Sequence, residues 1–408
     1  MSGVWLILAC LCVSACRDQP PDHPAAAPLR SDNAPRSSTE LRTTDGTIAL
    51  DNLQAQIESE QRLATYGPLT VKQRAGIAAL ISMRGQFLGS ITDYEQAEAL
   101  ANDLVRDAPN DGRAVLARAQ ARSTFHRFAA ALADLDAAER LGVHGPPVES
   151  LRAGIYQAMG RYDEALAIRQ PAAAARPDIE TLAAEATLRA DRGEIDAAER
   201  LFTEAPRHYR DVSPFPLAWL YFQQGLMWMR EGALNRAGAL FEAAHTRLPA
   251  YAAAQGHLAE VEAALGRRER AVALLRPLAQ RAEDPDYAAQ LARILGDAGD
   301  AAEARRWRDV AAARYDDLIR RHPEAFADHA AEFWLAAGND AQRALALAQR
   351  NLEVRPTPRA FELFLHAAVA AHDTARACAT LAQLGPQPWP SFRAVVTRAA
   401  PGCEHSQG

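Results

Sequence analysis

Two His/Glu pairs are the residues of this chain whose types and spacing could support chemistry. His257 and Glu260 are three positions apart, as are His329 and Glu332, and Asp328 precedes the second pair. An imidazole and a carboxylate spaced i, i+3 share one face of a helix, where they can chelate a metal ion. The two pairs are far apart in the chain, however, and a polar helix face with local hydrogen bonds accounts for both. We therefore expect no metal and no cofactor.

The motifs of common catalytic sites are absent from the sequence. It contains no H-E-x-x-H, no G-x-S-x-G, no phosphate-binding loop and no C-x-x-C. The 408 residues carry a net charge of −6 without a large basic block, which argues against a nucleic-acid partner. Ala is abundant and strand-forming runs are scarce, which favours an all-α fold. We predict an all-α protein that is not an enzyme.

The first sixteen residues, MSGVWLILACLCVSAC, contain an apolar run from Val4 to Val13 that is too short to span a bilayer and is typical of a signal peptide. The segment ends in V-S-A-C at Cys16, which resembles the lipobox of bacterial lipoproteins, although no Lys or Arg precedes the run. The resemblance implies removal of residues 1–15, acylation of Cys16 and attachment to the membrane through the lipid. In the sorting rule of this family, a residue other than Asp after the cysteine favours the outer membrane, facing the periplasm, and here it is Arg17. The alternative is an ordinary secretory signal that leaves Cys16 free.

Two cysteines lie near the other end of the chain, Cys378 and Cys403. In an exported protein we expect them to form one disulfide that ties the tail to the last helices, because the compartment is oxidising. The alternative is two unpaired thiols, with Cys378 buried in helix packing.

The N-terminal region before the repeats divides into two parts. Residues 16–46 are rich in Pro, Ala, Ser and charge and lack apolar periodicity, so we predict a disordered tether. Residues 47–77 are predicted to form N-terminal capping helices, with Leu53 and Ile57 on one apolar face and Thr70 as the N-cap of the helix that follows.

The segment 218–251 is the unit on which the rest of the chain is built. Small or apolar residues recur at i, i+4 and i+7 in each half, which predicts two helices with Gly232 in the turn between them. Gly225 allows the two backbones to approach, Phe241 fills the space beside it, and Pro249 ends the second helix. One such pair cannot bury its apolar face alone, so the pattern predicts an array.

This 34-residue spacing resembles the tetratricopeptide repeat (TPR), whose key positions 4, 8, 11, 20, 24, 27 and 32 are filled by Tyr221, Gly225, Trp228, Ala237, Phe241, Ala244 and Pro249. The period returns nine times from Ala78 onwards. The resemblance implies a right-handed α-solenoid of about nine TPR-like helix pairs over residues 78–391, with a C-terminal tail at 392–408 and one short helix at 391–398. Trp228 and Trp334 both fall at position 11 and are expected to pack in the core.

In the TPR family the first helix of each pair lines the concave face. Transfer of the inward positions to the fifth repeat gives the candidate partner groove, which consists of Trp219, Phe222, Leu226, Met229 and Arg230. Such an aromatic and Met-rich strip rimmed by charge is typical of a docking site for a peptide or helix. The alternative is internal packing, if the insertion at 208–216 or a tight superhelix covers the strip.

Together these features predict a protein–protein interaction scaffold, anchored by lipid in the bacterial envelope, that binds a peptide or protein in its concave groove. A periplasmic chaperone or ligand-binding module for exported polypeptides is the alternative. An envelope metal protein or enzyme is the least favoured function.

Overall fold

The computed structural model describes residues 41–383 and Cys403, and this part of the chain forms nineteen α-helices and no strand. A single helix, α1 (Gly46–Arg62), precedes nine helix pairs. The pairs are α2 (Val71–Leu88) with α3 (Ile91–Asp107), α4 (Gly112–Thr124) with α5 (Phe128–Arg140), α6 (Pro146–Ala158) with α7 (Tyr162–Ala175), α8 (Ile179–Asp191) with α9 (Ile195–Glu204), α10 (Phe215–Arg230) with α11 (Leu234–Arg247), α12 (Ala252–Ala264) with α13 (Arg268–Arg281), α14 (Asp286–Asp297) with α15 (Ala301–Arg321), α16 (Pro323–Leu335) with α17 (Ala341–Val354), and α18 (Pro358–Ala370) with α19 (Thr374–Gln383). The prediction of an all-α solenoid of nine pairs is confirmed. No helix in the described ranges is long and apolar enough to cross a membrane.

Each of the nine pairs turns through one residue with a left-handed backbone. Six pairs use glycine and the others use His126, Asn339 and His372, with φ values of 56°, 51° and 58°. A left-handed residue ends a helix because it directs the backbone out of the helical path, and glycine adopts this conformation without a steric penalty. At the other three turns, contacts of the side chain must therefore offset the steric cost of a left-handed backbone.

Packing inside a pair follows the predicted pattern of small and large residues. A Cβ atom added to Gly225 would lie 2.6 Å from the ring of Phe241, so only glycine admits this ring between α10 and α11. Phe241 and Ala237 are completely buried. At the start of the array Thr70 caps α2 through a capping box with Gln73, as predicted. Helix α2 begins at Val71, before the predicted start of the first repeat.

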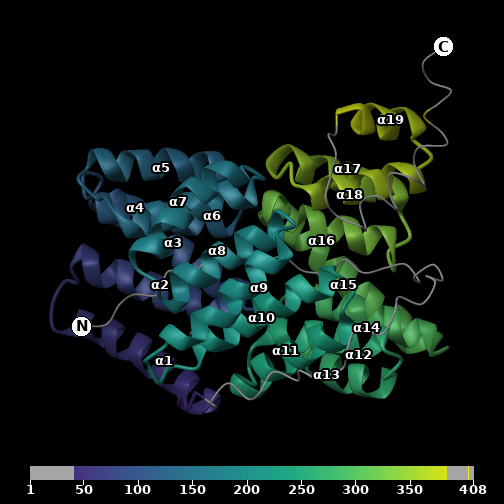
Figure 1. Ribbon diagram of the computed structural model, residues 1–408, viewed down its shortest axis with the longest axis horizontal. Helices are drawn as coiled ribbons and strands as arrows, with labels where there is room; N and C mark the ends of the chain where they lie inside the picture. The colour runs from purple at the N-terminus through teal and green to yellow at the C-terminus, as the bar shows by residue number, and fades with distance from the viewer. Residues whose placement is uncertain (1–40, 384–402, 404–408) are drawn as a thin grey trace.

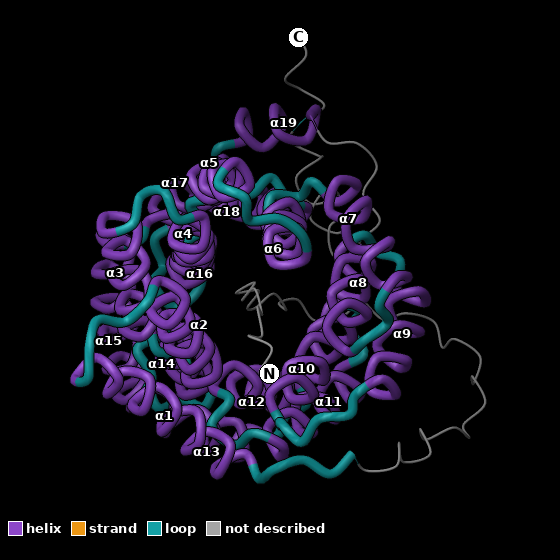
Figure 2. Tube along the Cα trace, turned by 90° about the vertical axis from the view of Figure 1, so that its left-hand side faces the viewer, coloured by secondary structure: helices purple, strands orange, loops and turns teal. Residues whose placement is uncertain are grey.

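The helix pairs wind about a central axis and form a ring when viewed along it (Figure 2). The early pairs lie on the left of Figure 1 and the late pairs on the right. Successive turns of the superhelix touch along a line that we call the seam. At each of its three contacts, called rungs, the turn inside an early pair meets the junction between two later pairs.

The first rung joins the turn of the first pair to the junctions on either side of the sixth pair. Phe87 is completely buried, with its ring 5.0 Å from that of Tyr251 and 4.8 Å from that of Phe215. The carboxylate of Glu283 accepts hydrogen bonds from the backbone N–H and the hydroxyl of Thr92, both at 2.6 Å. Glu283 therefore caps α3 from the next superhelical turn.

The second and third rungs repeat the same arrangement one and two pairs further along. In the second rung the turn at Phe125–Arg127 meets His322, between the seventh and eighth pairs. In the third rung Gly160 approaches the backbone between the eighth and ninth pairs, where an added Cβ would lie 2.8 Å from the carbonyl oxygen of Pro356. The constant offset shows that between five and six pairs complete one superhelical turn.

The end of the predicted tether is attached to the solenoid. The guanidinium of Arg247 donates to the carbonyl oxygen of Leu41 at 3.0 Å and to the hydroxyl of Thr43 at 2.9 Å. The N–H of Thr44 donates to the carbonyl of Val212 at 2.7 Å. The last residues of the predicted tether therefore contact the fifth pair and the segment before it, and α1 begins at Gly46. The signal peptide, Cys16 and the rest of the tether lie outside the described residues.

A disulfide joins Cys378, in the last helix, to Cys403, and their Cα atoms are 5.1 Å apart. This is the pairing expected from the sequence. The short helix predicted at 391–398 lies outside the described residues.

Candidate functional site

The predicted partner strip lies on α10, and most of it is buried. Phe222, Leu226 and Met229 are 4%, 5% and 4% exposed, whereas Trp219 and Arg230 are half-buried. The three apolar residues therefore pack inside the protein, which is the alternative of internal packing. Only the two ends of the strip reach the surface of the folded chain.

A chain of aromatic contacts explains this burial. The ring of Phe222 lies 5.1 Å from that of Tyr251 and 5.8 Å from that of Phe241, and Tyr251 in turn contacts Phe87 of the first pair. The superhelix is tight enough for its first turn to close over α10 and α12. The aromatic strip thus belongs to the core that joins the two turns.

A polar row crosses the first helices of the third, fourth and fifth pairs. The guanidinium of Arg230 pairs with the carboxylate of Asp191 at 2.6 Å, and the same carboxylate accepts a hydrogen bond from Gln157. Gln157, Asp191 and Arg230 stand at repeat positions 12, 13 and 13, which face inward in the TPR family. These donors and acceptors are suited to the backbone and charged side chains of an extended polypeptide.

The pair formed by His257 and Glu260 is enclosed by aromatic residues. His257 is 1% exposed, and its Nδ1 lies 3.3 Å from a carboxylate oxygen of Glu260. Its ring centroid lies 5.3 Å from that of Phe241 and 5.4 Å from that of Phe222. The imidazole therefore packs as an aromatic ring beside the carboxylate of Glu260.

The second pair is part of an ionic network with two arginines. Arg355 contacts Asp328 at 3.0 Å and Arg359 contacts Glu332 at 2.7 Å. Burial raises the pKa of Glu332 to about 7, and Arg359 only partly offsets it. Although burial opposes the charged form, His329 and Arg355 hold the pKa of Asp328 well below its usual range.

The structure does not bring the two His/Glu pairs together as ligands. Across the part of the chain that the structure describes, no three His, Cys, Asp or Glu side chains are arranged to hold a metal ion. Asp328 and Glu332 of α16 are each paired with an arginine of the following helix pair or its junction.

The two tryptophans at repeat position 11 share an arrangement that the sequence analysis missed. Each is partly buried and lies under an arginine of its own second helix. Arg236 is centred 3.6 Å from the ring of Trp228, and Arg343 is 3.9 Å from that of Trp334. These are cation–π contacts at equivalent places in the fifth and eighth pairs. An internal alignment of the repeats would have shown the matching arginines.

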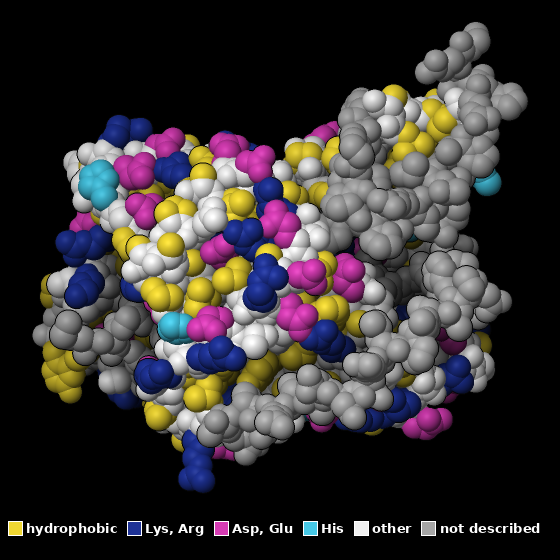
Figure 3. All heavy atoms as spheres, viewed as in Figure 1, with side chains coloured by type: hydrophobic (Ala, Val, Ile, Leu, Met, Phe, Trp, Pro, Cys, Tyr) yellow, Lys and Arg dark blue, Asp and Glu magenta, His cyan; other side chains and the backbone are white. Residues whose placement is uncertain are grey.

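Charged side chains of both signs are interspersed over the face of the molecule seen in Figure 3. This face therefore does not present a large area of one charge to a partner. Charged groups of different helix pairs converge in the polar row and in the second rung of the seam.

Comparison with known proteins adds the following findings. Residues 229–294, from the end of α10 into α14, match the family model described as tetratricopeptide repeat. A chain of the APC/C hetero-tetramer Cut9–Hcn1 is similar at 13% identity and a TM-score of 0.46, over 82% of this chain and 63% of that chain. Human IFIT1, solved as a dimer with PPP-AAAA, is similar at 16% identity and a TM-score of 0.49, over 86% of this chain and 78% of that chain. No curated protein sequence matches. The repeat match and the nine stacked helix pairs together support a tetratricopeptide-repeat protein.

Proposed function

We propose that this protein is a protein–protein interaction scaffold, held by lipid in the bacterial envelope, that binds a protein or peptide through the concave side of its solenoid. The observation that carries the proposal is the stack of nine TPR-like pairs. Each pair adds one first helix to a continuous inner surface, and repeat proteins use such surfaces to bind extended partners. The polar row is one part of this surface with partly exposed charge, since Asp191 and Arg230 are both half-buried.

The proposed anchor rests on the sequence that precedes the described residues. Cys16 follows an apolar leader, and Arg17 follows the cysteine. Acyl chains on Cys16 would replace the leader as the membrane anchor, and the segment up to Leu41 would connect them to the body. A Cys16→Ser variant should move the protein from the membrane fraction to the soluble fraction and abolish incorporation of labelled palmitate. A variant that remains in the membrane fraction contradicts the lipid anchor.

Crosslinking in intact envelopes, followed by purification of the protein, tests the binding function. A single partner in fixed stoichiometry supports a scaffold, whereas many unfolded clients support the alternative of a periplasmic chaperone. We expect the double change Asp191→Ala and Arg230→Ala to reduce capture of that partner.

The matched control is the change of Arg308 and Asp309 to Ala, because these residues form an exposed ion pair on α15 at 2.9 Å. Loss of one exposed pair has little effect on stability. Equal loss of capture in the two variants would show that the polar row is not the binding surface.

A further inference from the structure

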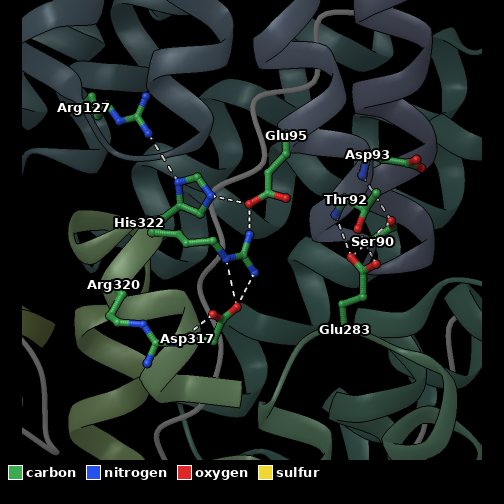
Figure 4. A network of polar contacts seen from close by, with 10 residues as sticks. Ser90, Thr92, Asp93, Glu95, Arg127, Glu283, Asp317, Arg320 and His322 are labelled. Carbon is green, nitrogen blue, oxygen red and sulfur yellow. Dashed lines mark hydrogen bonds and ion pairs between the residues drawn. The ribbon is translucent and has the colours of Figure 1, made fainter. Parts of the chain in front are cut away.

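His322 is the ionisable centre of the second rung (Figure 4). It follows the last residue of α15, is 6% exposed, and stacks on Phe125 with 3.8 Å between ring centroids. Its Nε2 lies 2.7 Å from a carboxylate oxygen of Glu95, and its Nδ1 lies 3.3 Å from the guanidinium of Arg127. A carboxylate accepts and a guanidinium donates, so Nε2 carries the hydrogen and Nδ1 is bare. The two partners therefore select the neutral form of His322.

His126 is the second histidine of the same rung. It occupies the left-handed position of its turn, with a φ of 56°, where six of the other pairs have glycine. Its Nδ1 lies 3.2 Å from the backbone carbonyl oxygen of Glu324, to which it donates, and the residue is 4% exposed. A non-glycine residue in this conformation carries a steric cost and persists where its surroundings stabilise it. The hydrogen bond from His126 to Glu324 in the next superhelical turn stabilises this conformation.

The groups around His322 favour its neutral form. Burial, and after it the charge of Arg127, lowers its pKa to about 4. The other charged groups that face the ring are Glu95, Glu98, Arg321 and Glu324. The carboxylates of Glu98 and Glu324 act against this shift but do not cancel it. A proton on Nδ1 would remove the hydrogen bond from Arg127 and place two cations in contact.

The environment of His126 acts in the same direction. Burial, and after it the charge of Arg355, lowers the pKa of His126 to about 3. His329 adds to this effect, whereas Asp328 and the carbonyl group of Glu324 oppose it. Both histidines of the rung are thus held neutral by contacts that exist only while the two superhelical turns touch.

The first rung differs because its centre is apolar. Phe87 and Tyr251 are buried at 0% and 2% exposure, so separation of this rung exposes large aromatic surfaces to water. Separation of the second rung exposes the apolar cluster of Phe125, Leu318 and Phe326 and, in addition, releases two imidazoles to water, where their ordinary pKa is about 6.5. A proton taken up in the separated form therefore stabilises separation below that pH.

We propose that the seam is a reversible latch, in which the second and third rungs separate while the first rung holds, and in which separation is coupled to proton uptake by His126 and His322. Separation would swing the last pairs away from the second and third pairs and widen access to the inner surface. The latch rests on the contacts of the seam and does not depend on the identity of any partner.

Hydrogen exchange of the full-length protein tests this inference, because exchange detects openings that are rare at equilibrium. Protection factors, corrected for the intrinsic effect of pH, should be measured at pH 7.5 and 5.0 for peptides covering residues 120–130 and 318–328. We expect protection there to fall at pH 5.0 by roughly 30-fold for each histidine that takes up a proton. Peptides covering the first rung, residues 84–90, should keep their protection. Unchanged protection in the second rung, or an equal fall in both rungs, would overturn the latch.

Two substitutions identify the groups that take up the proton. His322→Gln keeps an amide donor for Glu95, and His126→Asn keeps a donor on a residue that tolerates the left-handed conformation. The double variant should lose the pH dependence of protection. His372→Asn is the matched control, since His372 is left-handed at the equivalent turn of the ninth pair but exposed. Retention of the full pH effect in the double variant would also overturn the proposal. The comparison of the two rungs in the unmodified protein tests the latch even if the double variant does not fold.

Discussion

The first and second rungs of the seam solve the same packing problem with different chemistry. Both place the turn of an early pair against a junction of later pairs. The first rung uses Phe87 and Tyr251, whose rings lie 5.0 Å apart, while the second uses His322 stacked on Phe125 at 3.8 Å. An apolar contact keeps its strength over a wide pH range, whereas a buried imidazole makes the contact depend on its protonation. The same repeat geometry can therefore carry a permanent joint and a pH-dependent one.

The largest effect on stability is expected from a substitution of Phe87, which tests whether the first rung is a permanent joint. Phe87→Ala removes the completely buried ring at the centre of the first rung and leaves a cavity between the superhelical turns. We expect a loss of about 3–5 kcal/mol in the free energy of unfolding, measured by urea denaturation. The exposed Val369, at 43% exposure, is the control position, and Val369→Ala should change the stability little. A similar small change for Phe87→Ala would show that the first rung does not hold the turns together.

The third rung can be tested with two glycines that differ only in their surroundings. Gly160 and Gly299 both have a left-handed φ, of 74° and 85°, but only an added Cβ at Gly160 would meet the backbone of Pro356. Each change to Ala should cost about 1 kcal/mol for the strained backbone. Gly160→Ala should cost a further 1–2 kcal/mol, approximately, because the two turns must move apart. Equal stabilities of the two variants would show that the close contact in the third rung does not contribute to the free energy of unfolding.

The hydrogen bonds from Thr92 to Glu283 are a polar contribution of the first rung to stability. Glu283→Ala removes a carboxylate that accepts from the backbone and the hydroxyl of Thr92, so we expect a loss of about 1 kcal/mol. The exposed residue Glu269, in the first turn of α13, provides the control. If Glu283→Ala and Glu269→Ala have the same stability, the cap between the turns does not contribute.

The titration of His322 gives an effect on stability that depends on pH. Its pKa is about 4 in the closed protein and about 6.5 when exposed, so the unfolded chain binds more protons between these values. The stabilisation from this group is therefore complete above about pH 6.5 and is lost as the pH falls towards 4. We expect about 2 kcal/mol of this stability to be lost between pH 7.5 and 5.0. His322→Gln should reduce that pH dependence, and an unchanged slope in urea denaturation would contradict the assignment.

The helix pairs could be predicted from the sequence because their determinants are local. Gly225 and Phe241 lie within one repeat, and their spacing alone places the ring against the backbone. The capping box of Thr70 is likewise contained in four residues. The repeat period therefore determines the number and the type of the elements.

The seam could not be predicted because it depends on a rotation that accumulates over several pairs. A small difference in the angle between neighbouring repeats decides whether Phe87 meets Tyr251 or water, and single repeat motifs do not encode this angle. For the same reason Phe222 is buried although its repeat position faces inward in the TPR family. One signal was present, since His126 occupies the turn position that is usually glycine in this chain.

The attachment of residues 41–43 to Arg247 has a mechanical consequence. Tension applied at the amino-terminal end of the chain would reach the hydrogen bonds between Arg247 and Thr43 before it reaches α1. That load would pass directly into α11, in the middle of the stack, and α1 would be shielded from being peeled off the end of the array.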